Sequence, residues 1–161
     1  MVEPFARQPG EGRRFVAPTG DGLVVMAGEA ETGGAMSITE ILVAPLNGPR
    51  LHRHHREDEL WFVVDGEFRF KAGDRILRAS TGGLAYGPRG IAHCFQNVGA
   101  EPGRLLAITA PSGLDRFFED WQARGADPRD PAAWNEVGAP YGLEFVGPPL
   151  QVSDPLVGPA L

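Results

Sequence analysis

Short apolar runs separated by turn residues occupy the chain from residue 22 to residue 110. The runs are rich in β-branched and aromatic side chains, and their lengths are typical of strands rather than helices. They lie at residues 23–27, 36–43, 60–64, 67–70, 75–78, 84–86, 93–98 and 105–110. Glycine and proline stand between them, for example at Pro45, Gly66 and Pro88. The pattern predicts about eight to ten short strands in an all-β sandwich or barrel.

A helical period begins after Pro111. Apolar side chains recur there at intervals of three and four residues, at Leu114, Phe117, Phe118 and Trp121. One face of this helix is therefore apolar, and we expect it to cover the barrel or a partner subunit. A second short helix is predicted from Asp130 to about Val137, because Asp-Pro supplies an N-cap and a first-turn proline.

We expect one domain, because the chain has 161 residues and shows neither a repeat nor a long linker. Residues 1–21, rich in glycine, proline and arginine, are expected to form a poorly ordered arm or an edge segment. Residues 22–110 are expected to form the β-barrel. Residues 111–161 are expected to pack on it as helices and a tail, with strand-like composition at residues 142–146.

Composition and charge exclude several classes of protein. There are 15 basic and 21 acidic residues, a net charge of −6, which argues against a nucleic-acid backbone or an anionic membrane as partner. The single cysteine, Cys94, excludes a disulfide framework and is expected to be a small buried hydrophobe. The longest apolar run is five residues, Leu60 to Val64, and the N-terminal residues show no signal-peptide pattern. We therefore expect a cytoplasmic protein.

The histidines are unevenly distributed: His52, His54 and His55 lie within four residues. In an extended strand His52 and His54 leave the same face, roughly 7 Å apart at Cα, and can converge on one ion, whereas His55 points the other way. Glu59 lies an odd number of residues beyond His54, so it joins them only if the strand breaks among residues 55–58. The alternative is a solvated, charged surface turn, because His-x-His also occurs by chance.

Two segments resemble the two sequence motifs of the cupin superfamily. The first motif is a glycine, His-x-His, a glutamate and a further glycine, and is matched by Gly48, His52, His54, Glu59 and Gly66. It departs from the family at its start, where Gly48 precedes His52 by three residues rather than five. The second motif is matched at every position, by Gly82, Pro88, Gly90, His93 and Asn97. The short spacing between the motifs resembles that of small bacterial cupins.

The resemblance implies a cupin double-stranded β-helix, a jelly-roll-like barrel, with a short C-terminal helical segment. It also implies a divalent transition metal (Fe, Mn, Ni, Co, Cu or Zn) held by His52, His54, Glu59 and His93, with Asn97 in a structural role. Four ligands leave two positions of an octahedron open, which favours catalysis or ligand capture over a closed structural site. The donor set suits all six metals and does not distinguish between them.

The tail, at residues 113–118 and 141–150, also resembles that of single-domain quercetinase-like cupins. This resemblance implies a dioxygenase that acts on an aromatic or enolisable small molecule. Dioxygen would then be the second substrate, and Glu59 would be the catalytic group that accepts the substrate's proton. Other classes stay open, namely a metal-dependent isomerase, epimerase or cyclase, and a non-catalytic cupin that binds a small molecule.

Strand parity gives candidates for the substrate pocket. Trp61 and Val63 share the face of Glu59, and Phe95 shares the face of His93, so all three are expected to face the barrel interior. They either line the pocket or belong to the plain core. Because cupins are frequently dimers, we expect a homodimer.

Overall fold

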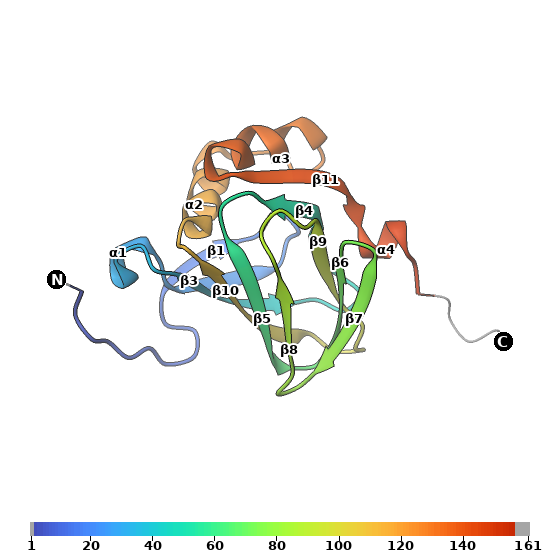
Figure 1. Ribbon diagram of the computed structural model, residues 1–161, viewed down its shortest axis with the longest axis horizontal. Helices are drawn as coiled ribbons and strands as arrows, with labels where there is room; N and C mark the ends of the chain where they lie inside the picture. The colour runs from blue at the N-terminus through green and yellow to red at the C-terminus, as the bar shows by residue number, and fades with distance from the viewer. Residues whose placement is uncertain (1, 157–161) are drawn as a thin grey trace.

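The computed structural model describes residues 2–156, and their strands form two antiparallel sheets that enclose a barrel (Figure 1). The six-stranded sheet contains, in spatial order, β1 (Arg13–Val16), β2 (Gly22–Ala27), β3 (Ser37–Val43), β10 (Gly103–Ala110), β5 (Asp58–Asp65) and β8 (Leu84–Gly87). The five-stranded sheet contains β11 (Leu143–Pro149), β4 (Arg50–His54), β9 (His93–Asn97), β6 (Glu67–Ala72) and β7 (Arg75–Ser80). This architecture confirms the predicted all-β barrel.

The main core lies between the two sheets. Side chains alternate along most strands, so that Leu105 and Ala107 of β10 are buried while Leu106 between them faces outward. Trp61 of β5 packs across the barrel against Phe70 and Phe95, with ring centroids 5.4 and 6.4 Å apart. The apolar runs recognised in the sequence therefore supply the barrel interior.

Both sheets extend beyond residues 22–110. β1 pairs with β2, so part of the N-terminal segment is an edge strand. β11 pairs with β4, where Phe145 lies opposite His52 and Leu143 lies opposite His54. The C-terminal part of the chain thus contributes a strand beside the two histidines.

The helices are α1 (Glu29–Thr32), α2 (Leu114–Arg124), α3 (Pro131–Gly138), the 3₁₀ helix η1 (Ala139–Tyr141) and α4 (Leu150–Ser153). α2 and α3 lie together at one end of the barrel, beside β11 (Figure 1). They form a second apolar cluster with β11, made of Leu114, Phe117, Trp121, Trp134, Val137 and Leu143. Within the described residues, no helix has the length and apolar character needed to cross a membrane.

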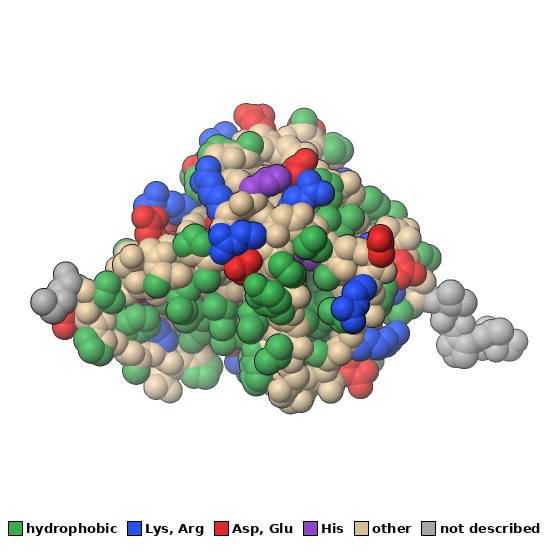
Figure 2. Space-filling model, viewed as in Figure 1, with side chains coloured by type: hydrophobic (Ala, Val, Ile, Leu, Met, Phe, Trp, Pro, Cys, Tyr) green, Lys and Arg blue, Asp and Glu red, His purple; other side chains and the backbone are tan. Residues whose placement is uncertain are grey.

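Apolar side chains are also exposed on the outer face of the six-stranded sheet. Figure 2 shows them over β5 and β8, and the exposed apolar side chains of this sheet include Leu42, Phe62, Leu84 and Tyr86. They alternate with buried positions of the same strands. Because successive side chains of a strand point to opposite faces, these residues lie on the outer face of the sheet. The homodimer expected above stays a prediction.

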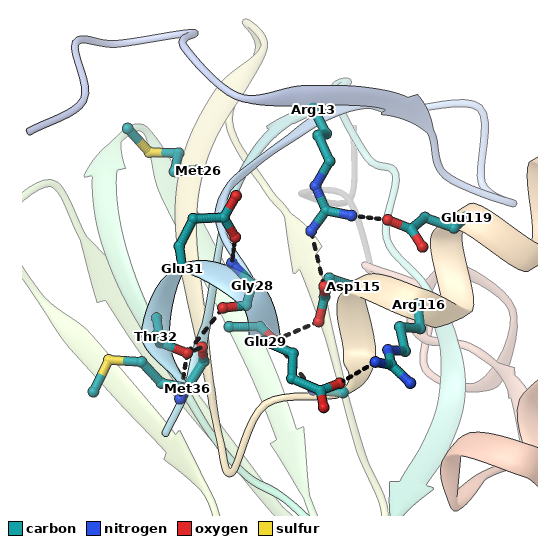
Figure 3. A network of polar contacts seen from close by, with 12 residues as sticks. Arg13, Met26, Gly28, Glu29, Glu31, Thr32, Met36, Asp115, Arg116 and Glu119 are labelled. Carbon is teal, nitrogen blue, oxygen red and sulfur yellow. Dashed lines mark hydrogen bonds and ion pairs between the residues drawn. The ribbon is translucent and has the colours of Figure 1, made fainter. Parts of the chain in front are cut away.

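A network of ion pairs and hydrogen bonds fixes the start of α2 against β1 and β3 (Figure 3). Arg13 Nη2 lies 2.9 Å from Asp115 Oδ2, and Ser37 Oγ donates to Asp115 Oδ1 at 2.8 Å. Arg13 also pairs with Glu119. Burial opposes ionisation of Asp115, but the bonds from Arg13 and Ser37 outweigh it and hold the pKa of this carboxyl below its ordinary value. The network joins the N-terminal strand to the helix that covers the barrel end.

Replacing Asp115 by asparagine is expected to lower the free energy of unfolding by about 1–2 kcal/mol at pH 7, because the charge-assisted bonds are lost while Arg13 stays partly solvated. The folded pKa of Asp115 lies below its ordinary value of 3.8. The wild-type advantage is therefore complete above pH 3.8 and disappears as the pH falls through the folded pKa. Urea unfolding of both proteins between pH 7 and pH 2 measures this difference.

Asp127→Asn is the matched control, because Asp127 pairs with the exposed Arg129 at 2.9 Å. We expect no measurable change in unfolding for this variant at pH 7. An Asp115→Asn protein as stable as the wild type at pH 7, or equally less stable at every pH, would contradict the role given to the network.

Candidate metal centre

Four buried side chains from three strands meet inside the barrel. His52 and His54 lie on β4, Glu59 lies on β5 and His93 lies on β9. One nitrogen or oxygen of each lies within 4.8 Å of those of the others. β4 and β9 carry two of them into contact directly, because His52 and His93 are partners in the antiparallel register. The structure thus brings together all four residues that the resemblance implied as ligands.

The chain breaks between β4 and β5, as the odd offset from His54 to Glu59 required. β4 ends at His54 and β5 begins at Asp58, with a bend over the three residues between them. Glu59 can therefore point inward together with His54. His55 points away, and its Nε2 lies 2.9 Å from Glu144 Oε2 at the surface.

The separations between the donor atoms fit a single metal ion. Glu59 Oε2 lies 3.1 Å from His54 Nε2, 3.2 Å from His93 Nε2 and 4.0 Å from His52 Nε2. Donors about 2.1 Å from an ion on adjacent corners of an octahedron are about 3 Å apart. His54 Nε2 is buried and has no hydrogen-bond partner in good geometry, which is unusual unless another group satisfies it. A divalent cation among the four atoms would do so.

The outer nitrogens of the imidazoles differ in their surroundings. His52 Nδ1 lies 2.7 Å from the carbonyl oxygen of Arg50, and His54 Nδ1 lies 3.3 Å from Glu57 Oε2. Acceptors at Nδ1 hold the proton there and leave the Nε2 lone pair free for a metal. His93 Nδ1 is buried without a hydrogen-bond partner. Two of the three histidines are therefore oriented by a contact behind the ring.

The charges of the cluster are strongly coupled. Burial lowers the pKa of His52 to about 4. Burial also opposes charging of His54, but the carboxylates of Glu57 and Glu59 outweigh it and raise the pKa of His54 to about 9. Burial disfavours ionised Glu59 as well, yet the three surrounding histidines hold its pKa well below the ordinary value. At neutral pH Glu59 is an anion, and a metal ion must displace the proton of His54.

A cavity of about 80 Å³ opens onto one side of the cluster, where His52, His54 and Glu59 face it. Most of its wall is apolar and includes Leu23, Ile41, Phe95, Phe117, Phe118 and Phe145. The polar wall residues beyond the cluster are Thr19, Asp21 and Thr39, and neither lysine nor arginine lines the cavity in the described chain. The cavity therefore has His52, His54 and Glu59 on one side and mostly apolar side chains on the others.

The three pocket candidates occupy different places. Phe95 lines the cavity. Trp61 and Val63 are buried in the core and do not line the cavity. Strand parity identifies the inward face correctly for all three, but it does not give the depth of a residue along the barrel.

Sequence reasoning missed several wall residues. Thr19 and Asp21 come from the loop between β1 and β2, which carries no motif. Trp134 and Phe145 come from α3 and β11, far along the chain. The apolar period of α2 indicated that this helix covers something, but not that it covers the cavity. The alternative of a solvated surface turn does not hold for Glu57, because its side chain is buried.

Two facing antiparallel sheets around three histidines and one glutamate define a β-barrel protein with a candidate metal centre. Residues 40–109 match the family model of the Cupin domain (Cupin_2). The matched segment, somewhat under half of the chain, includes all four cluster residues.

Known structures share the fold. An RmlC-like cupin from Shewanella frigidimarina NCIMB 400 superposes with a TM-score of 0.60 and 16% identity, over 72% of this chain and 99% of that one. A structure described as a sugar phosphate isomerase from a cupin superfamily, from Silicibacter pomeroyi, gives a TM-score of 0.54 and 17% identity, over 64% and 73% of the two chains. At these identities the likeness shows the fold alone.

Among curated proteins, the xanthan biosynthesis protein XanB of Xanthomonas campestris pv. campestris (strain B100) is 30% identical over 98 residues. The match covers 58% of this chain and 21% of that protein. This chain thus spans about a fifth of the length of that relative.

Proposed function

We propose that this chain is a metal-dependent dioxygenase for a small, uncharged aromatic or enolisable molecule. The observation that carries the proposal is that three of the four candidate ligands face a cavity with apolar walls. A divalent metal held by these four residues would keep room for ligands from outside the protein and would supply Lewis acidity and, if redox-active, chemistry with dioxygen. The resemblance of the tail to that of quercetinase-like cupins favours this reaction class over others.

The cavity wall indicates the charge of the substrate. Phosphate and carboxylate groups are usually recognised by arginine, lysine or backbone N–H groups. Among residues 2–156, no such cationic side chain lines the cavity, and Asp21 adds a negative charge to its wall. An anionic substrate would have only the metal to balance its charge and would leave the rest unpaired. These features favour a neutral molecule that becomes an anion only at the metal.

The volume also bears on the substrate. At roughly 10–15 Å³ for each water molecule, a cavity of about 80 Å³ holds roughly five to eight waters. This space suits a single-ring or short enolisable molecule better than a polycyclic flavonol. The aromatic side chains Phe95, Phe117 and Phe145 can pack against such a ring.

A bound metal would supply Lewis acidity and, for a redox-active ion, electron exchange with dioxygen. His52, His54 and His93 would hold it, together with Glu59. Glu59 also lines the cavity, so its carboxylate can accept the proton of a substrate hydroxyl or enolisable C–H group. The apolar walls exclude water from the anion that results.

A cupin isomerase is the second candidate, because the same Lewis acid and the same Glu59 carboxylate can shift a proton without oxygen. The fold is shared with a structure described as a sugar phosphate isomerase. A wall that holds Asp21 and, among the described residues, neither lysine nor arginine disfavours a phosphorylated substrate for this chain, so the isomerase would act on a neutral sugar or ketone.

The proposal predicts oxygen consumption in proportion to substrate loss. Protein loaded separately with Fe, Mn, Ni, Co, Cu and Zn is incubated with catechols, 1,3-diketones, a flavonol, neutral ketoses and sugar phosphates. Oxygen uptake and products are measured in air and under nitrogen. We expect uptake with a single-ring or diketone substrate, loss of activity in Glu59→Gln, and retained activity in His55→Ala.

Turnover that continues under nitrogen would replace the dioxygenase by the isomerase. Binding without turnover under all conditions would identify a binding protein. A preference for the sugar phosphates would contradict the inference drawn from the cavity wall.

A further inference from the structure

Glu57 is a buried acidic residue outside the ligand set. It lies in the bend between β4 and β5, and its residue is only 2% exposed. Its Oε2 lies 3.3 Å from His54 Nδ1, and its Oε1 lies close to Gly113, just before α2. Among the described residues, its only ion-pair partner is His54. A carboxylate is rarely buried without a partner of opposite charge, so this placement calls for a physical reason.

The charge of the candidate metal centre supplies that reason. Three neutral imidazoles and Glu59 neutralise one of the two charges of a divalent ion. The second positive charge would then be buried among aromatic side chains such as Trp61, whose ring lies 5.0 Å from that of His93. A second buried carboxylate nearby brings the total to zero. Glu57 is behind His54, on the side away from the other ligand atoms.

We propose that Glu57 is a positioning residue of the metal centre: it orients His54 through Nδ1 and balances the second charge of the ion. This inference rests on the proposed metal site but not on the dioxygenase reaction. The contact differs from the one behind His52, where a neutral backbone carbonyl accepts the Nδ1 proton. Glu57 is thus the one charged group behind a candidate ligand.

A centre that is neutral before substrate binds has a consequence for the ligand it accepts. An anionic ligand would add a negative charge to a buried, already balanced site. A neutral ligand that loses its proton to Glu59 would leave the total charge unchanged. Glu57 and a cavity wall without lysine or arginine among the described residues therefore favour the same class of substrate, a neutral molecule.

The test is the affinity of the purified protein for Zn²⁺ and Co²⁺, measured by competition with a chelator at pH 7. Glu57→Gln keeps the size and an acceptor oxygen but removes the charge, and we expect affinity to fall about 10–100-fold. Glu144→Gln is the matched control, because Glu144 also contacts a histidine, His55, but at the surface. It is expected to change affinity by less than about twofold.

Two further readouts separate positioning from a merely structural role. The visible spectrum of bound Co²⁺ should change in Glu57→Gln, whereas the loss of a merely structural contact would leave the spectrum unchanged. Glu57→Asp keeps the charge and should retain more affinity for the metal than Glu57→Gln. If the Glu57→Gln protein does not fold, Glu57→Asp is measured in its place. Equal affinity of Glu57→Gln and wild type, or of Glu57→Asp and Glu57→Gln, would overturn the inference.

The outcomes distinguish this inference from the proposed site. If the wild-type protein binds neither ion, the metal site itself fails. If the wild type binds both ions and Glu57→Gln binds them equally well, the metal site stands and only the role of Glu57 fails.

Discussion

Replacing His93 by alanine is expected to lower the affinity for Zn²⁺ or Co²⁺ by at least about 100-fold, because the change removes a ligand rather than an outer contact. His93 is fully buried, and its Nε2 lies 3.2 Å from Glu59 Oε2. His55→Ala is the control, because His55 lies three residues from His52 in the same polar segment but faces solvent and contacts Glu144. This variant is expected to bind within about twofold of the wild type.

Chelator competition gives both affinities, and elemental analysis of the purified variants gives the metal content directly. Circular dichroism of the metal-free proteins shows whether His93→Ala keeps the strand content of the wild type. Equal losses in the two variants would mean that the ligand set is wrong. A folded His93→Ala protein with unchanged affinity would exclude β9 from the metal centre.

Replacing Trp61 by alanine is expected to lower the free energy of unfolding by about 3–5 kcal/mol. The side chain is only 1% exposed and packs against Phe70, Phe95 and His93. Removing it leaves a large void between the two sheets, which the close-packed neighbours cannot fill. Phe62→Ala is the matched control, since Phe62 is the next residue on β5 but points outward and is 38% exposed. Its loss is expected to cost about 1 kcal/mol or less.

Urea unfolding of the metal-free proteins at pH 7 measures both values. Omitting the metal matters because Trp61 touches a candidate ligand, and bound metal would add its own stabilisation. Similar losses for the two variants would show that Trp61 does not hold the core together. A stable Trp61→Ala protein that loses only substrate binding would mean that Trp61 lines the substrate pocket rather than the core.

The candidate metal centre lies near the end of the barrel that the C-terminal elements cover. The cluster lies on β4, β5 and β9, and α2, α3 and β11 add wall residues to the cavity beside it. Packing these elements there makes the second apolar cluster and shields the cavity at the same time. The apolar environment in turn strengthens the electrostatic interactions among the four cluster residues. Stability of the C-terminal segment and properties of the centre are thus coupled.

The strands and the ligand types were accessible from the sequence because both depend on local patterns. Alternation along residues 67–70 identifies Phe68 and Phe70 as inward residues, and the structure buries both. The His-x-His spacing places two imidazoles on one face of any extended strand. The offset to Glu59 even required the bend that separates β4 from β5.

Other features depended on the packing of distant segments. The run Glu57-Asp58-Glu59 has the composition of a solvated turn, yet Glu57 and Glu59 are buried while Asp58 pairs with Arg89 at the surface. Which carboxylate turns inward is decided by the bend and by the histidines that receive it. Similarly, Trp61 and Phe95 both face inward, and only their positions along the barrel axis separate a core residue from a cavity residue.

By itself, the sequence predicted short strands around an apolar interior and two imidazoles, His52 and His54, on one face of a strand, and its resemblance to the cupin motifs implied Glu59 and His93 as further ligands. The tertiary structure decided which end of the barrel is covered, that Phe117 and Phe145 line the cavity, and that Glu57 lies behind His54. The physical reason is the range of the interactions. Periodicity and spacing act within a few residues, whereas cavity shape and charge balance arise only where segments remote in sequence pack together.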